Sequence, residues 1–360
     1  MSVTPAQTER RIGLPHPSTV KCADQLSKKW DTAGNQPLPP GEGSVITPDR
    51  VGIDDIGDGI SFLLLGDCGG IEDPNPQKAV AAAMVEAIQA DPSIKFVAIC
   101  GDVVYFDGDP AQYMPQMWQP WAYVQVPFVA CPGNHDGDPT DGVAGAGISS
   151  FMANWCDPQG PRAPQGDPQM EFGRHTQTLP YCYWAIQFKS FLLIGLYSNV
   201  ASGGFLDGSQ QAFLTSTLEG APQEMPSMVF LHHPPFSVDA MHGGSRNMLE
   251  DLDSCFAAAN RWPTVVAAGH IHDDQRFTRT TPSGPVTYLV TGNGGYHNRH
   301  AIAGDYSPGM QLPGGVVCDY ADASAWGFLK ITVKGGHMSG SYTQVPLSGP
   351  VTEGADTFST

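Results

Sequence analysis

The sequence has few basic residues, no long apolar run and no dense set of cysteines. Its 360 residues include 18 Lys and Arg against 36 Asp and Glu, a formal net charge of −18. A surface this acidic repels nucleic-acid backbones and anionic membranes, so we expect neither as a partner. The longest apolar runs, such as 190–196, are strand-length and too short to cross a bilayer. Residues 1–19 lack the unbroken apolar stretch of an export signal, which favours a cytoplasmic protein, with export as the alternative.

Eight cysteines are too sparse for a disulfide scaffold, and no pair has the spacing of a structural zinc site. Cys68, Cys100 and Cys131 end apolar runs, where buried free thiols are expected. Cys156 and Cys182 bracket a polar loop and could form a bridge if the protein were exported, an alternative that the sequence leaves open.

With 42 Gly and 32 Pro, the chain is typical of a loop-rich globular protein. We expect one large layered domain rather than two equal ones. We expect residues 1–57 to form an irregular N-terminal arm, residues 58–346 the main folded domain, and residues 347–360 a C-terminal tail that frays. The insertion at 137–180 is rich in Gly, Pro, Asp and Gln, and we expect it to be a long loop that rims the functional site.

Apolar runs at 60–65 and 95–100 flank an alanine-rich helix at 79–90, a pattern that predicts two parallel strands with a helical crossover. The runs that end in polar clusters are 60–65, 95–100, 126–131, 228–231 and 265–268. In open α/β sheets ligands bind beyond the carboxyl ends of strands, so we expect the five clusters to meet. The strand-like segments 286–291, 327–333 and 339–345 predict a second sheet packed on the first.

In order, the clusters read Gly66-Asp67-Cys68-Gly69, Gly101-Asp102-Val103-Val104-Tyr105, Gly133-Asn134-His135-Asp136, His232-His233-Pro234 and Gly269-His270-Ile271-His272. Each cluster alone is a weak signal of a functional site, because Gly-Asp and Gly-Asn pairs also mark turns and two histidines can simply end a strand. Together they supply imidazole, carboxylate, amide and phenol donors that suit two adjacent transition metals.

These motifs, in this order over residues 66–272, resemble the metallophosphoesterases and, within them, the purple acid phosphatases. The resemblance implies an α/β fold, a four-layer α/β/β/α sandwich of two mixed sheets flanked by helices, with a dinuclear metal centre between the sheets.

Gly69 stands where most metallophosphoesterases have a histidine that binds the first metal. Tyr105 matches the tyrosine with which purple acid phosphatases bind ferric iron. A phenolate favours a hard trivalent ion, so we expect Fe³⁺ in the first site and Fe²⁺, Zn²⁺ or Mn²⁺ in the second. The alternative is that Tyr105 is a core aromatic beside Phe106.

Carried over to this chain, the resemblance implies three roles for the seven candidate ligands. Asp67, Tyr105 and His272 would hold the first metal, Asn134, His232 and His270 the second, and Asp102 would bridge them. The family pattern of His, any residue, Pro selects His232 over His233, which we expect to be structural.

The resemblance also implies catalytic side chains. His135 would contact the phosphoryl group, with Asp136 setting its tautomer, unless His135 is only a turn residue. His242 would protonate the leaving alkoxide. We expect His297, Arg299 and His300 to lie on a solvated loop and not to contact the substrate.

The expected activity is hydrolysis of a small phosphate monoester by a metal-bound hydroxide, as in an acid phosphatase, with activity at acidic pH. One alternative is a phosphodiesterase of the same superfamily, and another is a non-catalytic binding scaffold with this fold. The sequence does not determine the substrate or the oligomeric state.

Overall fold

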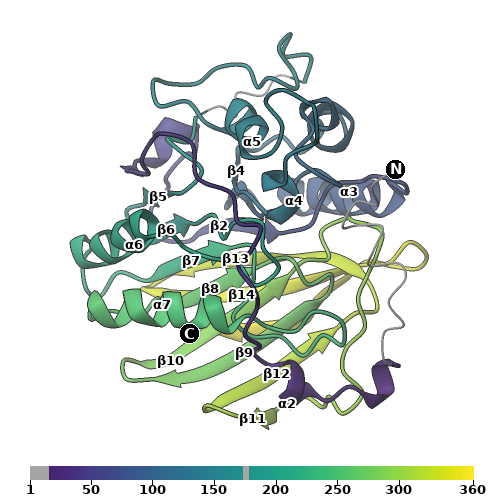
Figure 1. The fold of residues 1–360 in the computed structure, drawn as a ribbon, viewed down its shortest axis with the longest axis vertical. Helices are drawn as coiled ribbons and strands as arrows, with labels where there is room; N and C mark the ends of the chain where they lie inside the picture. Colours follow the sequence, from purple (N-terminus) through teal and green to yellow (C-terminus); the bar gives the residue numbers. More distant parts are fainter. Residues whose placement is uncertain (1–15, 173–177) are drawn as a thin grey trace.

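A computed structural model describes residues 16–172 and 178–360 (Figure 1). The prediction about an export signal falls mainly on residues 1–15 and so lies outside the described residues. No helix within the described ranges is long and apolar enough to cross a membrane. All eight cysteines are buried free thiols, Cys156 and Cys182 among them.

The strands of the described residues form two sheets, which lie one over the other in Figure 1. The six-stranded sheet has the order β15-β14-β13-β2-β3-β4, and its strands are β2 (Ile60–Leu65), β3 (Ile94–Cys100), β4 (Phe128–Cys131), β13 (Trp326–Lys334), β14 (His337–Val345) and β15 (Thr352–Ser359). The nine-stranded sheet has the order β1-β5-β6-β7-β8-β10-β9-β12-β11, and its strands are β1 (Val45–Ile46), β5 (Trp184–Gln187), β6 (Leu192–Gly195), β7 (Ser227–Leu231), β8 (Val265–Ala268), β9 (Asp274–Thr281), β10 (Gly284–Thr291), β11 (Met310–Leu312) and β12 (Val316–Asp322).

Strand β2 forms because six consecutive residues without glycine or proline are all buried, as is typical of a parallel strand covered on both faces. It pairs in parallel with β3, and β3 pairs in parallel with β4. The crossover between β2 and β3 is helix α3 (Asn75–Ala90), which carries Pro76 in its first turn and is rich in alanine. The predicted strand, helix and strand are confirmed.

Helices cover the outer faces of both sheets, which completes the expected α/β/β/α layering (Figure 1). Helix α3 packs on β13 and β14 of the six-stranded sheet. Helices α6 (Gly208–Gly220) and α7 (Arg246–Ala258) pack together over the nine-stranded sheet. The shorter elements are η1 (Pro17–Thr19), α2 (Cys22–Gln25), η2 (Pro48–Val51), η3 (Pro110–Gln112), η4 (Met114–Trp118), α4 (Asn134–Gly137) and α5 (Ile148–Trp155).

The core between the sheets is built from stacked aromatic rings. Phe62 of β2 stacks on Phe96 of β3 with ring centroids 4.6 Å apart, and each also stacks on a phenylalanine between β5 and β6, Phe191 and Phe188 respectively. The Trp184 indole of β5 donates a hydrogen bond to the carbonyl of Ala130 in β4 (3.0 Å). Buried aromatic pairs of this kind add to the free energy gained from apolar burial, so they hold the two sheets in one arrangement.

A second sheet packs on the first, as predicted, but its predicted composition is wrong, because the strands after residue 272 divide between the two sheets. Strand β10 pairs in parallel with β8 and antiparallel with β9, so β9 and β10 belong to the nine-stranded sheet. Strand β13 instead pairs with β2 in the six-stranded sheet. Alternation shows which side of a strand is buried but not which strand becomes its neighbour.

The predicted frayed tail is also wrong. Residues 352–359 form β15, which pairs antiparallel with β14 at the edge of the six-stranded sheet. Asp356 accepts two hydrogen bonds from the Arg276 guanidinium of β9 (2.7 and 2.9 Å), a bidentate pair that ties this edge to the other sheet. The final strand is therefore part of the sandwich.

The described parts of the arm and of the 137–180 insertion pack against the sandwich. The arm hydrogen-bonds to the segment before α7, for example from the Gly244 amide to the Gln25 carbonyl (2.8 Å). The insertion contains α5, whose Trp155 packs on Trp118, so it is not simply a loop. Its Thr140 hydroxyl donates to Asp107, two residues after Tyr105 (2.8 Å).

Candidate metal centre

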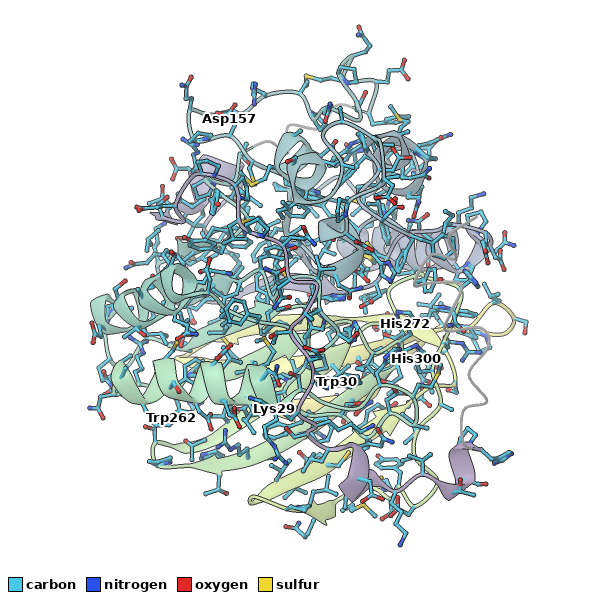
Figure 2. The ribbon with its side chains drawn as sticks, viewed as in Figure 1. Lys29, Trp30, Asp157, Trp262, His272 and His300 are labelled. Carbon is cyan, nitrogen blue, oxygen red and sulfur yellow. The ribbon has the colours of Figure 1, made fainter. Side chains whose placement is uncertain are left out.

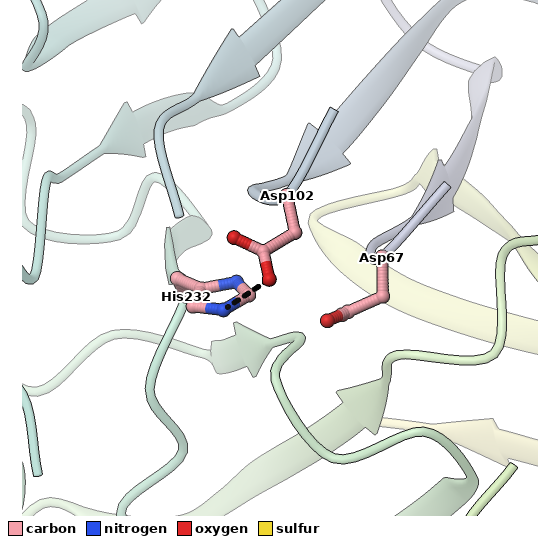
Figure 3. Close-up of side chains that lie close together, drawn as sticks. All are labelled: Asp67, Asp102 and His232. Carbon is pink, nitrogen blue, oxygen red and sulfur yellow. Dashed lines mark ion pairs between the residues drawn. The ribbon is translucent and has the colours of Figure 1, made fainter. Parts of the chain in front are cut away.

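The predicted ligands lie at the carboxyl ends of strands from both sheets. Asp67 follows β2, Asp102 follows β3 and Asn134 follows β4, whereas His232 follows β7 and His270 follows β8. Figure 3 shows that the side chains of Asp67, Asp102 and His232 converge from three strand ends. Their ligand atoms all lie within 4.8 Å of one another.

Three of these residues have left-handed backbone conformations, with φ of 55° at Asp67, 52° at Asp102 and 67° at His270. Non-glycine residues rarely adopt this region, and a side chain held there costs about 1–3 kcal/mol. Each of the three directly follows a glycine at a strand end. The chain therefore turns sharply as it leaves the strand, and the turn directs the side chain into the space between the sheets.

One group of donors surrounds Asp67. Its Oδ1 lies 3.3 Å from His272 Nε2 and 3.1 Å from the Tyr105 hydroxyl, and the hydroxyl is 3.5 Å from His272 Nε2. The His272 Nδ1 pairs with the Asn298 carbonyl (2.6 Å), which orients the ring so that Nε2 faces the aspartate. The three residues predicted to hold the first metal thus present their donor atoms to one point.

A second group surrounds Asn134. Its Oδ1 lies 2.9 Å from His232 Nε2 and 3.0 Å from His270 Nδ1. The Asp102 Oδ2 is 3.3 Å from the same His232 nitrogen. His232 Nδ1 pairs with the Cys100 carbonyl (2.8 Å), an arrangement typical of histidine ligands to metals. The structure therefore brings together all seven residues that the sequence predicted as ligands.

The donor set fits cations because it buries two carboxylates whose charged neighbours are histidines and not lysine or arginine. Asp67 is fully buried and Asp102 is 1% exposed. Within residues 16–172 and 178–360, neither carboxylate pairs with a lysine or arginine. A buried charge needs compensation, and two adjacent polyvalent cations would supply it.

The pKa values at the centre show the same charge imbalance. Burial alone would lower the pKa of His232, but the negative charges of Asp102 and Asp67 outweigh burial and raise this pKa to about 9. Burial alone would raise the pKa of Asp102, but His232 and His135 outweigh burial and hold the pKa of Asp102 below its usual value. Burial and Asp67 raise the pKa of Tyr105 well above its usual value, so a phenolate there requires a strong cation beside it.

The prediction that Asp136 sets the His135 tautomer is wrong. Asp136 is fully buried and accepts backbone amide hydrogen bonds from Gly133 (2.8 Å) and from Val103 and Val104 (3.2 Å each). Burial and Asp102 raise its pKa to about 7. Its carboxyl group therefore joins the loops after β3 and β4.

His135 faces the centre from the loop after β4. Its Nδ1 pairs with the Phe106 carbonyl, and its amide donates to Asp102 Oδ1 (3.0 Å). The ring packs on Tyr105 with centroids 4.6 Å apart, and its Nε2 lies 3.9 Å from Asp102 Oδ2. The Phe106 carbonyl takes the orienting role that the sequence had assigned to Asp136.

His300 is a residue that the sequence analysis misplaced, because it is 4% exposed and not on a solvated loop. Its ring lies 4.2 Å from that of His272 and 4.8 Å from that of His242, and Figure 2 shows His272 and His300 together. Its Nδ1 accepts from the His272 amide (3.3 Å) and lies 3.6 Å from Asp239. No motif surrounds His300, so only the fold reveals it.

The other histidines divide between the centre and its surroundings. His242 lies beside His270, with ring centroids 5.1 Å apart, and its amide donates to Asp239 (2.6 Å). The His233 Nδ1 pairs with the Ser198 hydroxyl (2.8 Å), which fits a structural residue. His297 pairs instead with the Ile71 carbonyl (3.2 Å).

Gly69 has no room for a side chain, because Tyr105 occupies the space. A Cβ atom at residue 69 would lie 2.8 Å from Tyr105 Cδ2 and 2.7 Å from Gln116 Oε1. Gln116 is itself fixed, since its amide group exchanges hydrogen bonds with the Tyr105 backbone (2.6 and 3.0 Å). A histidine side chain at residue 69 would therefore need the space that the Tyr105 ring fills, so the two side chains cannot both be present.

Gly69→Ala is expected to lower the free energy of unfolding by about 1–3 kcal/mol, the usual cost of overpacking. The new methyl group must displace the Tyr105 ring or the Gln116 amide. Urea denaturation of the wild type and the variant measures the change. Gly208→Ala is the control, because a Cβ there meets nothing within 4 Å and improves helix propensity. Equal stability of Gly69→Ala and wild type would contradict the crowding.

The two sheets have the metallophosphoesterase fold, and their strand ends bring together two groups of donors that could hold metal ions. The family model described as calcineurin-like phosphoesterase matches residues 60–274, which is more than half of the chain. The chain belongs to the calcineurin-like phosphoesterase family.

Individual relatives are distant. The probable cyclic nucleotide phosphodiesterase of Rhodopseudomonas palustris is 24% identical over 201 residues, 55% of this chain and 64% of its own length. The purple acid phosphatase of yellow lupin (Lupinus luteus) seeds shares the fold with a TM-score of 0.60 and 16% identity, over 84% of this chain and 54% of the lupin chain. A dimetal phosphatase of Danio rerio has a TM-score of 0.50 and 11% identity, over 82% of this chain and 99% of its own. The chain thus spans less than two thirds of the length of the first two relatives.

Proposed function

We propose that this protein hydrolyses phosphate monoesters at a dinuclear metal centre of the purple acid phosphatase type. The observation that carries the proposal is the place of Tyr105. Its hydroxyl lies within 3.5 Å of both Asp67 and His272, and its ring fills the space where a histidine at residue 69 would stand.

The donors support a division into two metal sites. Asp67, Tyr105 and His272 would hold Fe³⁺, because a phenolate with a carboxylate favours a hard trivalent ion. Asn134, His232 and His270 would hold Fe²⁺, Zn²⁺ or Mn²⁺, and Asp102 would bridge. When bound, two such cations neutralise phosphate oxygens and acidify a water molecule.

The side chains around the ligands support the remaining steps. His135, oriented by the Phe106 carbonyl, would donate from Nε2 to a phosphoryl oxygen. His242, whose backbone amide is held by Asp239 next to His270, would protonate the leaving alkoxide through a ring nitrogen. Burial and His300 lower the pKa of His242 to about 3, so the negative charge of the bound phosphate would have to raise it before the ring can carry that proton. His300, between His242 and His272, would hold the His242 ring in place.

A phosphodiesterase remains the second candidate, because the Rhodopseudomonas palustris relative is a probable cyclic nucleotide phosphodiesterase. A non-catalytic scaffold is disfavoured, because every predicted ligand is present and converges on one site.

The two activities are separated by the substrate preference of the purified enzyme. We expect kcat/KM for nitrophenyl phosphate to exceed that for bis(nitrophenyl) phosphate and for cyclic AMP by at least about tenfold, a difference of about 1.4 kcal/mol in transition-state binding. Steady-state kinetics with all three substrates provides the measurement. A preference for either diester would assign the protein to the phosphodiesterases, and no turnover of any of them would favour the scaffold.

A further inference from the structure

Asp274, the first residue of β9, faces the space between the two sheets. Its register partners are Thr291 of β10 and Asp322 of β12, so the three side chains lie in a row on one face of the nine-stranded sheet. Arg276 lies two residues further on and shares this face. Because Arg276 bonds to Asp356 of β15, the face is the one that meets the six-stranded sheet.

The row contains buried oxygen atoms without partners. Asp274 is 2% exposed, and within the described parts of the chain its Oδ1 is buried without a hydrogen-bond partner. The hydroxyl of Thr291 and the amide oxygen of Asn293 are also buried without a partner there. Asn293 is held between the sheets because its amide nitrogen donates to the Tyr342 hydroxyl of β14 (2.5 Å). Several unsatisfied oxygens in one buried place are rare in folded proteins and call for a ligand or a proton.

The charges around Asp274 are mainly negative. The carboxylates of Asp356, Asp273 and Asp322 all lie around Asp274. Arg276 opposes them, but its guanidinium is already held by Asp356 and by Asp319 (3.2 Å). Asp322 uses Oδ2 to accept from Gln344 (3.0 Å), which leaves its Oδ1 for another contact.

We propose that a Ca²⁺ ion binds between the sheets at Asp274, in a site separate from the dinuclear centre. The donors are the carboxylates of Asp274 and Asp322, the hydroxyl of Thr291 and the amide oxygen of Asn293. Ca²⁺ prefers such hard oxygen ligands and commonly completes its shell with water, whereas the absence of imidazole and thiolate donors from the set disfavours zinc or copper. The ion joins three strands of one sheet at the place where Asn293 and Tyr342 contact the other, so it acts on stability and not on turnover.

The test uses the full-length protein with its active-site metals bound and adds Ca²⁺ alone. We expect one further Ca²⁺ per chain by equilibrium dialysis and a rise in the melting temperature, because a ligand that binds only the folded state stabilises it. Asp274→Asn keeps the size of the side chain and removes its charge. It should weaken Ca²⁺ binding at least tenfold and abolish the rise in melting temperature, while kcat for a phosphoester stays at the wild-type value.

A spectroscopic readout separates this site from the dinuclear centre. Tb³⁺ replaces Ca²⁺ in oxygen sites, and Tyr342 is close enough to sensitise its emission. The emission should be lost in Asp274→Asn and retained in Asp102→Ala, which removes the proposed bridging ligand. If Asp274→Asn does not fold, Thr291→Val provides the same comparison with a smaller loss of affinity. Asp24→Asn, on the exposed side of α2, is the control for the loss of one carboxylate.

Either of two results would overturn the proposed Ca²⁺ site. If Asp274 simply carries a proton, wild type binds no extra Ca²⁺, its melting temperature does not respond to Ca²⁺, and Asp274→Asn is as stable as wild type. Ca²⁺ binding that is the same in wild type, Asp274→Asn and Thr291→Val would place the ion elsewhere and also reject the site. Neither result would affect the proposed phosphatase activity.

Discussion

Asp102→Ala is expected to lose both metal ions and at least about 10³-fold of turnover. The carboxylate lies 3.3 Å from His232 Nε2, and its ligand atom is within 4.8 Å of that of Asp67, so one side chain serves both donor groups. Residues that only support a metal ligand already change affinity or activity by about 10–100-fold when replaced, and a shared ligand should cost more. Elemental analysis of the purified variant and its rate with nitrophenyl phosphate measure the two effects.

The control for this variant is Asp24→Ala, which removes an exposed carboxylate from α2. It should retain two metals and full turnover. Circular dichroism of Asp102→Ala must show a folded protein, because the His135 amide loses its acceptor as well. A folded Asp102→Ala with two equivalents of metal and a normal rate would reject the bridging role.

Tyr105→Phe is expected to abolish a visible charge-transfer band that the wild type shows with iron bound. The variant removes the hydroxyl that lies 3.1 Å from Asp67 but keeps the ring that stacks on Tyr296 at 3.9 Å, so the packing should survive. Loss of one of the four proposed protein donors should weaken the first site by at least about tenfold and lower turnover by a similar factor or more. Absorption spectroscopy, iron analysis and kinetics measure the three effects.

Tyr296→Phe is the matched control, because it removes a hydroxyl group from the other ring of the same stacked pair. It should keep the colour and the iron. A colourless wild type with two equivalents of zinc or manganese would leave the family assignment in place but reject the purple acid phosphatase type. A Tyr105→Phe protein that keeps the band would mean that another group supplies it.

The strands that carry the metal centre could be predicted because their sequence pattern is strong. The run 60–65 matches β2 at both ends, and the predicted strand 265–268 matches β8. Strand β15 was missed because its residues are mostly polar and half exposed, so its stability comes from pairing with β14 and from the Arg276 pair. The assignment of strands to sheets was missed because pairing depends on the whole fold.

The motifs predicted the candidate metal ligands, but they did not predict which way the side chains around these ligands point. Asp136 adjoins His135 in the sequence, yet its carboxyl turns to the amides of the loop after β3. Adjacency along the chain does not determine which way a side chain points. His300 lies 28 residues from His272 and is connected to it only through tertiary contact.

The left-handed backbone at Asp67, Asp102 and His270 lowers the stability of the fold at the positions that carry three of the candidate ligands. Glycine would relieve the strain at each position, so selection for thermal resistance alone would favour replacing the very side chains that converge on the centre. The strain persists because neighbouring contacts oppose its release, such as the hydrogen bond from the His270 amide to Asp67 (2.7 Å). An engineer who seeks a more heat-resistant form would therefore leave these three turns unchanged and work on the outer loops.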